Sequence, residues 1–169
     1  MRLFIAIQFE ENILNALTAF QNDMRCMGVT GNYTKRENLH LTLAFIGDYG
    51  NPDEVLDTME QVEFKPIDVE LEGVGSFGEL FWAGIKNNPR LEGYVRRLHR
   101  QLSENDIPYG NKRFLPHITL IRQYKYLGGG EIPVYDPPKG SMRATHISLM
   151  KSERGKNGMI YTEIGSIDC

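Results

Sequence analysis

Two stretches of the sequence carry the same polar pattern inside apolar runs: "RENLHLTLAFIG" at residues 36–47 and "RFLPHITLIRQ" at residues 113–123. In each, an Arg stands four positions before a His, a Thr follows the His by two positions, and a Leu follows it by three. The chain has four His and eight Thr among 169 residues, which gives about 0.2 His-x-Thr matches by chance. Two matches in similar surroundings indicate a repeated functional motif.

Both stretches alternate as β-strands do, and successive side chains of a strand point to opposite faces. His40 and Thr42 are therefore expected on one face, and His117 and Thr119 likewise share a face of the second strand. The apolar residues between and beyond them are expected on the opposite faces: Leu41, Leu43 and Phe45 in the first strand, Ile118 and Leu120 in the second.

The paired histidines suit acid–base chemistry. A single His on a half-buried strand is more often a hydrogen-bonded structural residue than a catalyst. A polar motif that is placed twice inside apolar strands incurs a burial cost twice, which favours function. Two imidazoles facing one groove can divide the roles of acid and base near neutral pH, and the two Thr hydroxyls can hold phosphate oxygens. The pattern predicts in-line cleavage of a phosphoester without a metal ion.

The composition fits one folded domain spanning residues 1–169. The apolar content of 41% is enough for a core, and no apolar run reaches the length of a membrane span. The opening "MRLFIAIQFEEN" is predicted to be a strand rather than a signal peptide. Cys26 and Cys169 lie far apart without metal-ligand spacing, which favours a reducing cytoplasm.

Charge is unevenly distributed, although the net charge is only −3. Residues 51–72 contain eight acidic residues and one Lys, whereas residues 90–125 contain eight basic and three acidic residues. Solvated helix faces explain most of both runs. The excess of five basic residues nevertheless surrounds the second motif.

Strands and helices are expected to follow one another in a compact α+β domain with two related halves, each a sheet with a helix against it. A tight hairpin at Asn157 and Gly158 and a Gly- and Pro-rich loop around residues 128–140 complete the pattern. Helices are predicted at 10–27, 50–62 and 87–105, with Asn51 and an Asn-Pro pair as starts. Strands are predicted at 2–9, 39–47, 67–77, 79–86, 143–153 and 159–167, and the second His strand lies within 113–123.

The sequence resembles the 2H phosphoesterase superfamily, whose members carry two His-x-Thr-x motifs. Within it, the chain is similar to the RNA 2′,3′-cyclic phosphodiesterases, historically called 2′-5′ RNA ligases. The resemblance covers nearly the whole chain and rests on "MRLFIAI", "ENLHLTLAFIG", "LFWAGI" and "RFLPHITLIR".

This resemblance implies a bilobal, pseudo-symmetric fold in which two antiparallel sheets surround a central cleft and helices pack on the outside. It also implies roles: His40 donates a proton to the leaving ribose oxygen, and His117 accepts one from the attacking water. Thr42 and Thr119 would hold the phosphate, and the product would be a 2′-phosphomonoester. No cofactor or metal ion is implied, and we expect a cytoplasmic monomer that acts on RNA 3′ ends or small cyclic-phosphate nucleotides.

Three other functions remain open from the sequence. The same cleft would also suit 2′-5′ ligation of RNA or hydrolysis of another cyclic or 2′-5′ phosphodiester. An RNA-end-binding module without catalysis is a second alternative, although both motifs are intact. A zinc site built from His40 and His117 is the third, and it lacks a third ligand at suitable spacing.

Three arginines near the motifs are ambiguous. Arg122 falls on the strand face opposite His117 if the strand is regular, yet the family often has Arg there; a bulge would turn it into the cleft as a phosphate ligand. Arg36 and Arg113 share the face of the following His only if the strand extends backwards, and Pro116 opposes this in the second motif.

The other two histidines and two aromatic residues are expected to be structural. His146 in "THISLMKSE" imitates the motif, but it is predicted to pack in a late strand. His99 is predicted on a helix surface. Phe81 and Trp82 are expected to pack, with stacking of a base on Trp82 as the alternative.

Overall fold

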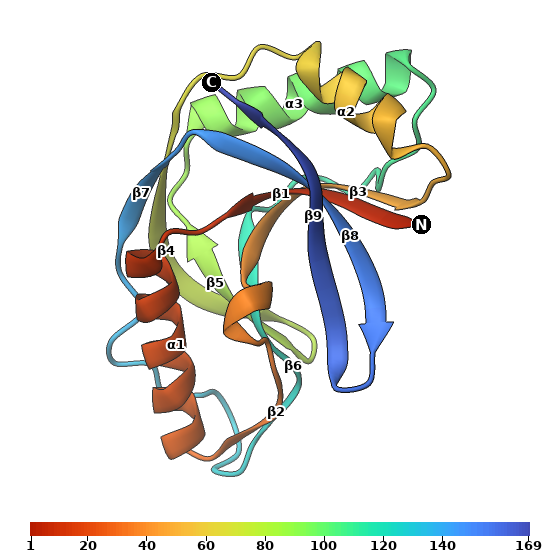
Figure 1. Cartoon of the computed structure of the whole chain (residues 1–169). Coiled ribbons are helices and arrows are strands. Elements are labelled where there is room, and N and C mark those ends of the chain that lie inside the picture. The colour runs from red at the N-terminus through yellow and green to blue at the C-terminus, as the bar shows by residue number, and fades with distance from the viewer.

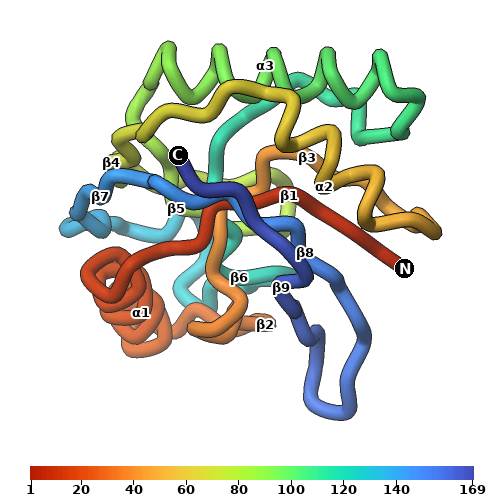
Figure 2. Tube along the Cα trace, turned by 45° about the horizontal axis from the view of Figure 1, so that its top comes forward, coloured from red at the N-terminus to blue at the C-terminus, as the bar shows by residue number.

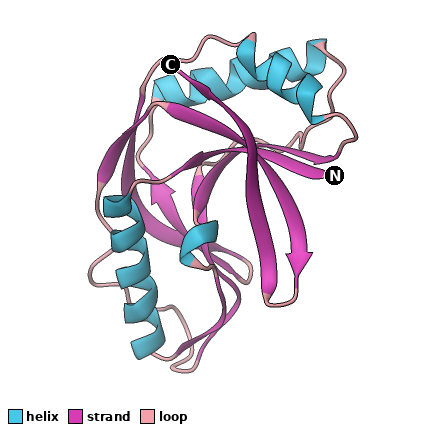
Figure 3. Ribbon diagram, in the orientation of Figure 1, coloured by secondary structure: helices cyan, strands magenta, loops and turns pink.

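The computed structural model describes residues 1–169 and contains three α-helices, one 3-10 helix and nine strands. Figure 1 shows these elements, and Figure 3 separates them by type. In chain order they are β1 (Arg2–Gln8), α1 (Glu11–Cys26), β2 (Val29–Tyr33), η1 (Arg36–Asn38), β3 (His40–Asp48), α2 (Pro52–Glu60), β4 (Ile67–Phe77), β5 (Leu80–Ile85), α3 (Pro89–Glu104), β6 (His117–Tyr126), β7 (Ser141–Ala144), β8 (His146–Gly155) and β9 (Gly158–Asp168).

The strands form two antiparallel sheets, which confirms the predicted α+β class. Sheet A has four strands in the order β3-β1-β8-β9, and sheet B has five in the order β2-β6-β5-β4-β7. The first motif opens β3 in sheet A, and the second opens β6 in sheet B. Each sheet therefore contributes one His-x-Thr pair.

The helices do not each cover the sheet of the preceding strand. Helix α1 follows β1 of sheet A, yet it packs against β2 and β7 of sheet B. Helices α2 and α3 pack against each other at the other end of the molecule, where α2 contacts β9 and α3 contacts β3 and β4. Figure 2 shows α1 well separated from this pair. The connections thus interlock the halves, contrary to the simple expectation of one sheet with its own helix.

A single cluster of 36 buried residues draws on both sheets. Leu41 of β3 and Ile118 of β6, each next to a motif His, are both fully buried in it. The predicted apolar side of α3 is buried as well. Burial of a Leu or Ile side chain contributes about 1.5–3 kcal/mol, so the apolar half of each motif anchors its strand while the polar half faces outward.

The structure differs from the prediction in two places. The stretch 143–153 is not one strand, because it breaks at Thr145: β7 pairs with β4 in sheet B, and β8 pairs with β1 and β9 in sheet A. Strand β2 was not predicted, since its sequence "VTGNY" is short, mostly exposed and interrupted by Gly31.

The turns and helix starts are close to expectation. Helix α3 begins after Asn88, whose side chain accepts a hydrogen bond from the Arg90 amide at 3.0 Å. Asn51 precedes α2 but donates to Glu54 instead of capping. The β8–β9 hairpin turns at residues 156–157, one position earlier than predicted. No helix combines the length and apolar character that a membrane crossing requires.

Candidate active site

A cleft of about 670 Å³ is lined by strands of both sheets. All five residues that the sequence singled out for the site line this cleft: His40, Thr42, His117, Thr119 and Arg122. The two motifs, 77 positions apart in the chain, therefore meet in one place.

Both histidines are held by the same local hydrogen bond. Nδ1 of His40 lies 2.7 Å from the carbonyl oxygen of Asn38, and Nδ1 of His117 lies 2.6 Å from that of Leu115. A carbonyl oxygen only accepts, so Nδ1 carries the proton in both rings. Nε2 is therefore the nitrogen available for proton transfer, and in His40 it lies 2.8 Å from the Thr42 hydroxyl.

The surroundings of His40 favour its neutral form. Burial lowers the pKa of His40 below the ordinary value, and the hydrogen bond to the Asn38 carbonyl opposes this shift. The positive charges of Arg122 and His117 lower the pKa further. The His40 ring lies 4.8 Å from the Phe4 ring and 5.3 Å from the Tyr161 ring, which explains its desolvation.

Arg122 reaches the cleft through a β-bulge. Phe81 pairs with Ile121 and Trp82 with Thr119, so β6 contains one extra residue between these pairs. The side chains of Leu120 and Ile121 are consecutive and both fully buried. The bulge reverses the alternation, and Arg122 consequently shares the face of His117. This settles the position that a regular strand left ambiguous.

Strand β3 has an equivalent irregularity, which makes one prediction wrong. Leu43 and Ala44 are both buried, and the pairing of β1 with β3 shifts register on either side of Ala44. Phe45 therefore turns into the cleft with 56% of its surface exposed, instead of lying on the core face. Phe45 and Arg122 each follow their motif His by five positions.

Arg36 and Arg113 do not line the cleft. Arg36 lies in η1, so the strand does not extend back to it, and its guanidinium bonds Asn15 at 2.8 Å and pairs with Glu11 of α1. Arg113 is exposed in the loop before β6.

Trp82 and Phe81 pack within the protein, as favoured from the sequence. Trp82 is the cross-strand partner of Thr119, but its ring lies against Phe77 at 5.2 Å and does not line the cleft. A Cβ on Gly75 would lie 2.4 Å from this indole, so the glycine makes room for it. Phe81 is buried and stacks on Phe20 of α1.

His146 lies at the start of β8 and does not line the cleft. Its Nδ1 bonds Asp168 and its Nε2 bonds Glu163 at 2.8 Å, while Ser148 also donates to Glu163. Hydrogen bonds to these carboxylates raise the pKa of His146, and the bond to Asp168 has the largest effect. No sequence pattern indicated this network, because both acids come from the next strand, β9.

The prediction for His99 was wrong. Its ring is half-buried and packs 4.6 Å from the Tyr109 ring, and its Nε2 donates to the Leu43 carbonyl at 2.9 Å. Helix α3 contacts β3, so this flank of the helix is a packing surface rather than a solvated one.

Sequence reasoning missed two groups of cleft residues. Arg2 and Arg154 line the cleft from β1 and β8, whereas Arg122 is the sole member of the basic run 90–125 to do so. Only the pairing of β1 with β8 brings the first two together. The second group is the single residue Asn38. Its backbone carbonyl accepts the hydrogen bond from His40, and its buried side-chain amide donates to the Met159 carbonyl of β9 at 3.0 Å.

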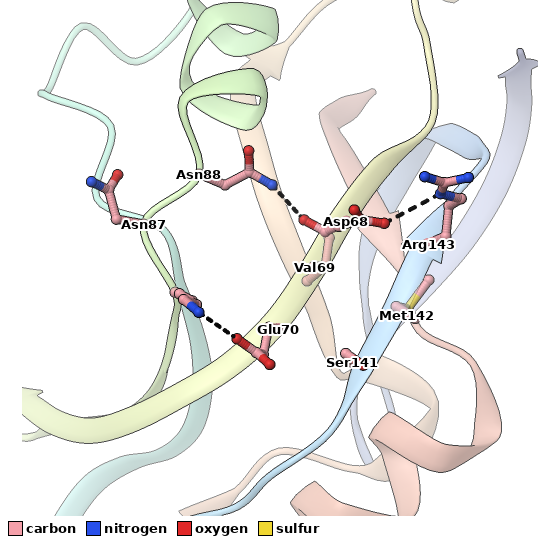
Figure 4. Close-up of a pocket in the computed structure, with 9 residues that line it drawn as sticks. Asp68, Val69, Glu70, Asn87, Asn88, Ser141, Met142 and Arg143 are labelled. Atoms are coloured by element: carbon pink, nitrogen blue, oxygen red, sulfur yellow. Dashed lines mark hydrogen bonds and ion pairs between the residues drawn. The ribbon is translucent and has the colours of Figure 1, made fainter.

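A second hollow, shown in Figure 4, lies away from the histidines between β4, β7 and the start of α3. Its charges neutralise one another, since Lys86 pairs with Glu70 at 3.3 Å and Arg143 with Asp68 at 3.2 Å. It offers no free charge to a ligand.

The histidine cleft does not provide a zinc donor set. Nowhere in the chain do three or more His, Cys, Asp or Glu side chains gather in an arrangement that would hold a metal ion. Zinc sites use at least three such protein ligands.

Comparison with known proteins identifies the family of this chain. The family model described as LigT like Phosphoesterase matches residues 7–81, which include the first motif. An RNA 2′,3′-cyclic phosphodiesterase of Methanocaldococcus jannaschii is 30% identical over 97% of this chain and 98% of its own length. The chain belongs to the RNA 2′,3′-cyclic phosphodiesterase family.

Other relatives extend the similarity. A second RNA 2′,3′-cyclic phosphodiesterase, from Methanothermobacter thermautotrophicus, is 25% identical over 97% of this chain and 96% of its own. The fold also matches the crystal structure of E. coli LigT in apo form, with a TM-score of 0.82, 24% identity, and coverage of 99% of this chain and 96% of that chain. The family resemblance and the bilobal fold are thereby confirmed.

Proposed function

We propose that this protein is an RNA 2′,3′-cyclic phosphodiesterase that hydrolyses a terminal cyclic phosphate to a 2′-phosphomonoester without a metal ion. The observation that carries the proposal is the pair of imidazoles, one from each sheet, that line one cleft with Nδ1 bound to a backbone carbonyl. Relatives of similar length bear the same activity in their names.

The proposed reaction is an in-line displacement at phosphorus. Nε2 of His117 accepts a proton from water as the water oxygen bonds to phosphorus. The bond between phosphorus and the ribose 3′ oxygen breaks, and His40 donates its Nε2 proton to that oxygen. The products are a 2′-phosphate, which contains the water oxygen, and a 3′ hydroxyl, which has received a proton. The atoms of one water molecule are thereby accounted for.

Thr42, Thr119 and Arg122 are proposed to hold the non-bridging phosphate oxygens. The Thr42 hydroxyl is bonded to His40 in the free cleft, so it must turn to the phosphate when substrate binds. Arg122 supplies a charge-assisted donor from the other sheet. These donors would stabilise the negative charge that builds up on the phosphoryl oxygens.

The acid role of His40 requires that the substrate change its protonation. The free cleft lowers the pKa of His40, whereas a bound phosphate brings negative charge that raises it. Binding of the substrate would therefore charge the proton donor where the proton is needed.

We expect the protein to work as a monomer in the cytoplasm. The cleft is complete within one chain, and Cys26 and Cys169 are both exposed free thiols. Exposed thiols of this kind persist in a reducing compartment.

The test is an RNA oligonucleotide that ends in a 2′,3′-cyclic phosphate, incubated with and without EDTA. We expect a 2′-phosphate, identified by phosphorus NMR and end-mapping, at the same rate in both samples. Joined RNA strands would instead indicate 2′-5′ ligation. Loss of turnover in EDTA that Mg²⁺ or Zn²⁺ restores would exclude the two-imidazole mechanism.

A further inference from the structure

The cleft is not symmetric about the two histidines. Beyond the motif residues, most of its lining belongs to sheet A, including Arg2, Ser152, Arg154 and Tyr161, whereas sheet B adds only Leu80 outside β6. The open part of the cleft therefore extends from His40 along the exposed face of sheet A.

Arg2 and Arg154 form a basic pair on this face. Arg2 is the cross-strand partner of Ser152, and Arg154 follows Ser152 by two residues, so both arginines point to the same side of the sheet. Both are exposed, and neither forms an ion pair. Arg36 and Arg143, by contrast, are each paired with a carboxylate. The two cleft arginines are therefore free to bind an anion.

The position of this pair matches the path of an RNA strand. In the proposed reaction His40 protonates the leaving ribose oxygen, so the terminal ribose and the RNA attached to it lie on the His40 side. Phe4 contacts the His40 ring, and Arg2 precedes Phe4 by two residues on the same face, which is about 7 Å along a strand. When the terminal ribose lies at His40, the phosphate on its 5′ side can lie at this distance, close to Arg2.

We propose that Arg2 and Arg154 bind the phosphodiester immediately 5′ of the terminal nucleotide. This inference rests on the proposed function and on the role of His40 as proton donor. It predicts that the protein prefers a dinucleotide with a terminal 2′,3′-cyclic phosphate over the cyclic mononucleotide. Charge-assisted hydrogen bonds of this kind correspond to a preference of about 10-fold to 10²-fold in kcat/KM.

Three substrates isolate the charge of that phosphate. The first is a 2′,3′-cyclic mononucleotide, and the second is a dinucleotide ending in the same cyclic phosphate with a deoxynucleoside at its 5′ position. The third is identical to the second but carries a neutral methylphosphonate linkage. We expect wild-type kcat/KM to be high for the second and about equally low for the other two. Equal values for the phosphodiester and the methylphosphonate would overturn the inference while leaving the proposed function intact.

Variants then assign the effect to residues. In the double variant Arg2→Gln/Arg154→Gln, kcat/KM for the phosphodiester should fall to that for the methylphosphonate. Each single variant should show part of this loss. Turnover of the mononucleotide should stay unchanged in all three variants. Lys151→Gln is the matched control, because this residue lies on β8 beside Ser152 but pairs with Glu153 and does not line the cleft.

Two further outcomes separate the hypotheses. An advantage that persists in Arg2→Gln, in Arg154→Gln and in the double variant would overturn the assignment of these arginines. Absence of turnover on all three substrates with wild-type protein would overturn the proposed function, and this inference with it.

Discussion

Phe45 and Arg122 occupy matching places, five residues after the His of their motifs and beyond a bulge in each strand. One presents an apolar ring to the cleft and the other a guanidinium. The two halves of the cleft thus share a scaffold but differ in chemistry. In the proposed mechanism Arg122 gives the phosphate a counter-charge, and its positive charge also lowers the pKa of His40.

Replacing Arg122 by Gln should raise the pKa of His40 toward its ordinary value, because one of the charges that disfavour imidazolium is removed. The same change should lower kcat/KM by about 10²-fold to 10³-fold through loss of a phosphate donor. The two effects are measured by NMR titration of the His40 ring and by steady-state kinetics.

Arg113→Gln is the control for this experiment, since Arg113 precedes a motif His but does not line the cleft. It should leave both quantities nearly unchanged. A His40 pKa that responds equally to both variants would show that the effect is one of overall charge.

The pH dependence should differ between kcat/KM and kcat. The profile of kcat/KM reports the free protein, in which the pKa of His40 lies below the ordinary value of about 6.5. The proposed mechanism needs protonated His40 together with neutral His117, so kcat/KM should trace a bell against pH whose limbs belong to the pair. Bound phosphate raises the pKa, and the alkaline limb of kcat should lie at higher pH. An alkaline limb of kcat below that of kcat/KM would contradict the assignment of His40 as the acid.

His40→Ala and His117→Ala should each reduce kcat by about 10²-fold to 10⁴-fold, the usual contribution of a positioned acid or base. The double variant should lose much less than the product, because the two residues act as a unit. Thr42→Ala and Thr119→Ala should cost about 10-fold to 10³-fold. His146→Ala, outside the cleft, is the control with near-normal turnover; the reverse pattern in folded proteins would refute the assignment.

At the level of strands, the sequence predicted the first four residues of each motif well and the next few poorly. Alternation places His40 and Thr42 on one face of the strand and Leu41 and Leu43 on the other, because one face must be buried. Alternation does not predict the positions of Ala44 and Phe45. Two adjacent buried residues, here Leu43 and Ala44, fit either a bulge or a strand that is buried on both faces. The register with β1 decides between these, and that register depends on contacts distant in sequence.

The chain around Thr145 illustrates the same limit. The stretch 143–153 reads as one strand, yet its two parts pair with different sheets. Local pattern indicates an extended backbone but does not identify the partner strand. The ion pairs of His146 with β9 could not be predicted for the same reason.

These ion pairs predict a pH-dependent stability of the β8–β9 hairpin. The pKa of His146 is raised in the folded protein, so its protonation stabilises the fold. This contribution is complete below the unfolded pKa of about 6.5 and is lost as the pH rises through the folded value. His146→Gln should therefore lower the Tm relative to wild type more at pH 5.5 than at pH 9. Exposed pairs of this kind contribute about 1 kcal/mol or less, and a Tm difference independent of pH would contradict the expectation.

For the molecule as a whole, the cleft depends on how the two sheets are joined. Helix α1 leaves sheet A and packs on sheet B, and α3 contacts strands of both sheets. One continuous core unites them. Helix periodicity revealed that these helices are amphipathic, but not which sheet each would cover. The relative placement of His40 and His117 thus follows from packing between the halves.

We predict that the two halves unfold together, because neither sheet can separate without exposing the shared core. Trp82, the single tryptophan, reports on sheet B by fluorescence, while far-UV circular dichroism reports on all elements. The two probes should give coincident urea transitions with the same midpoint and slope. Hydrogen exchange of β1 and β8 should require the same free energy of opening as that of β5 and β6, as expected of one cooperative unit. A fluorescence transition separated from the dichroism transition would show instead that the chain contains two units of different stability.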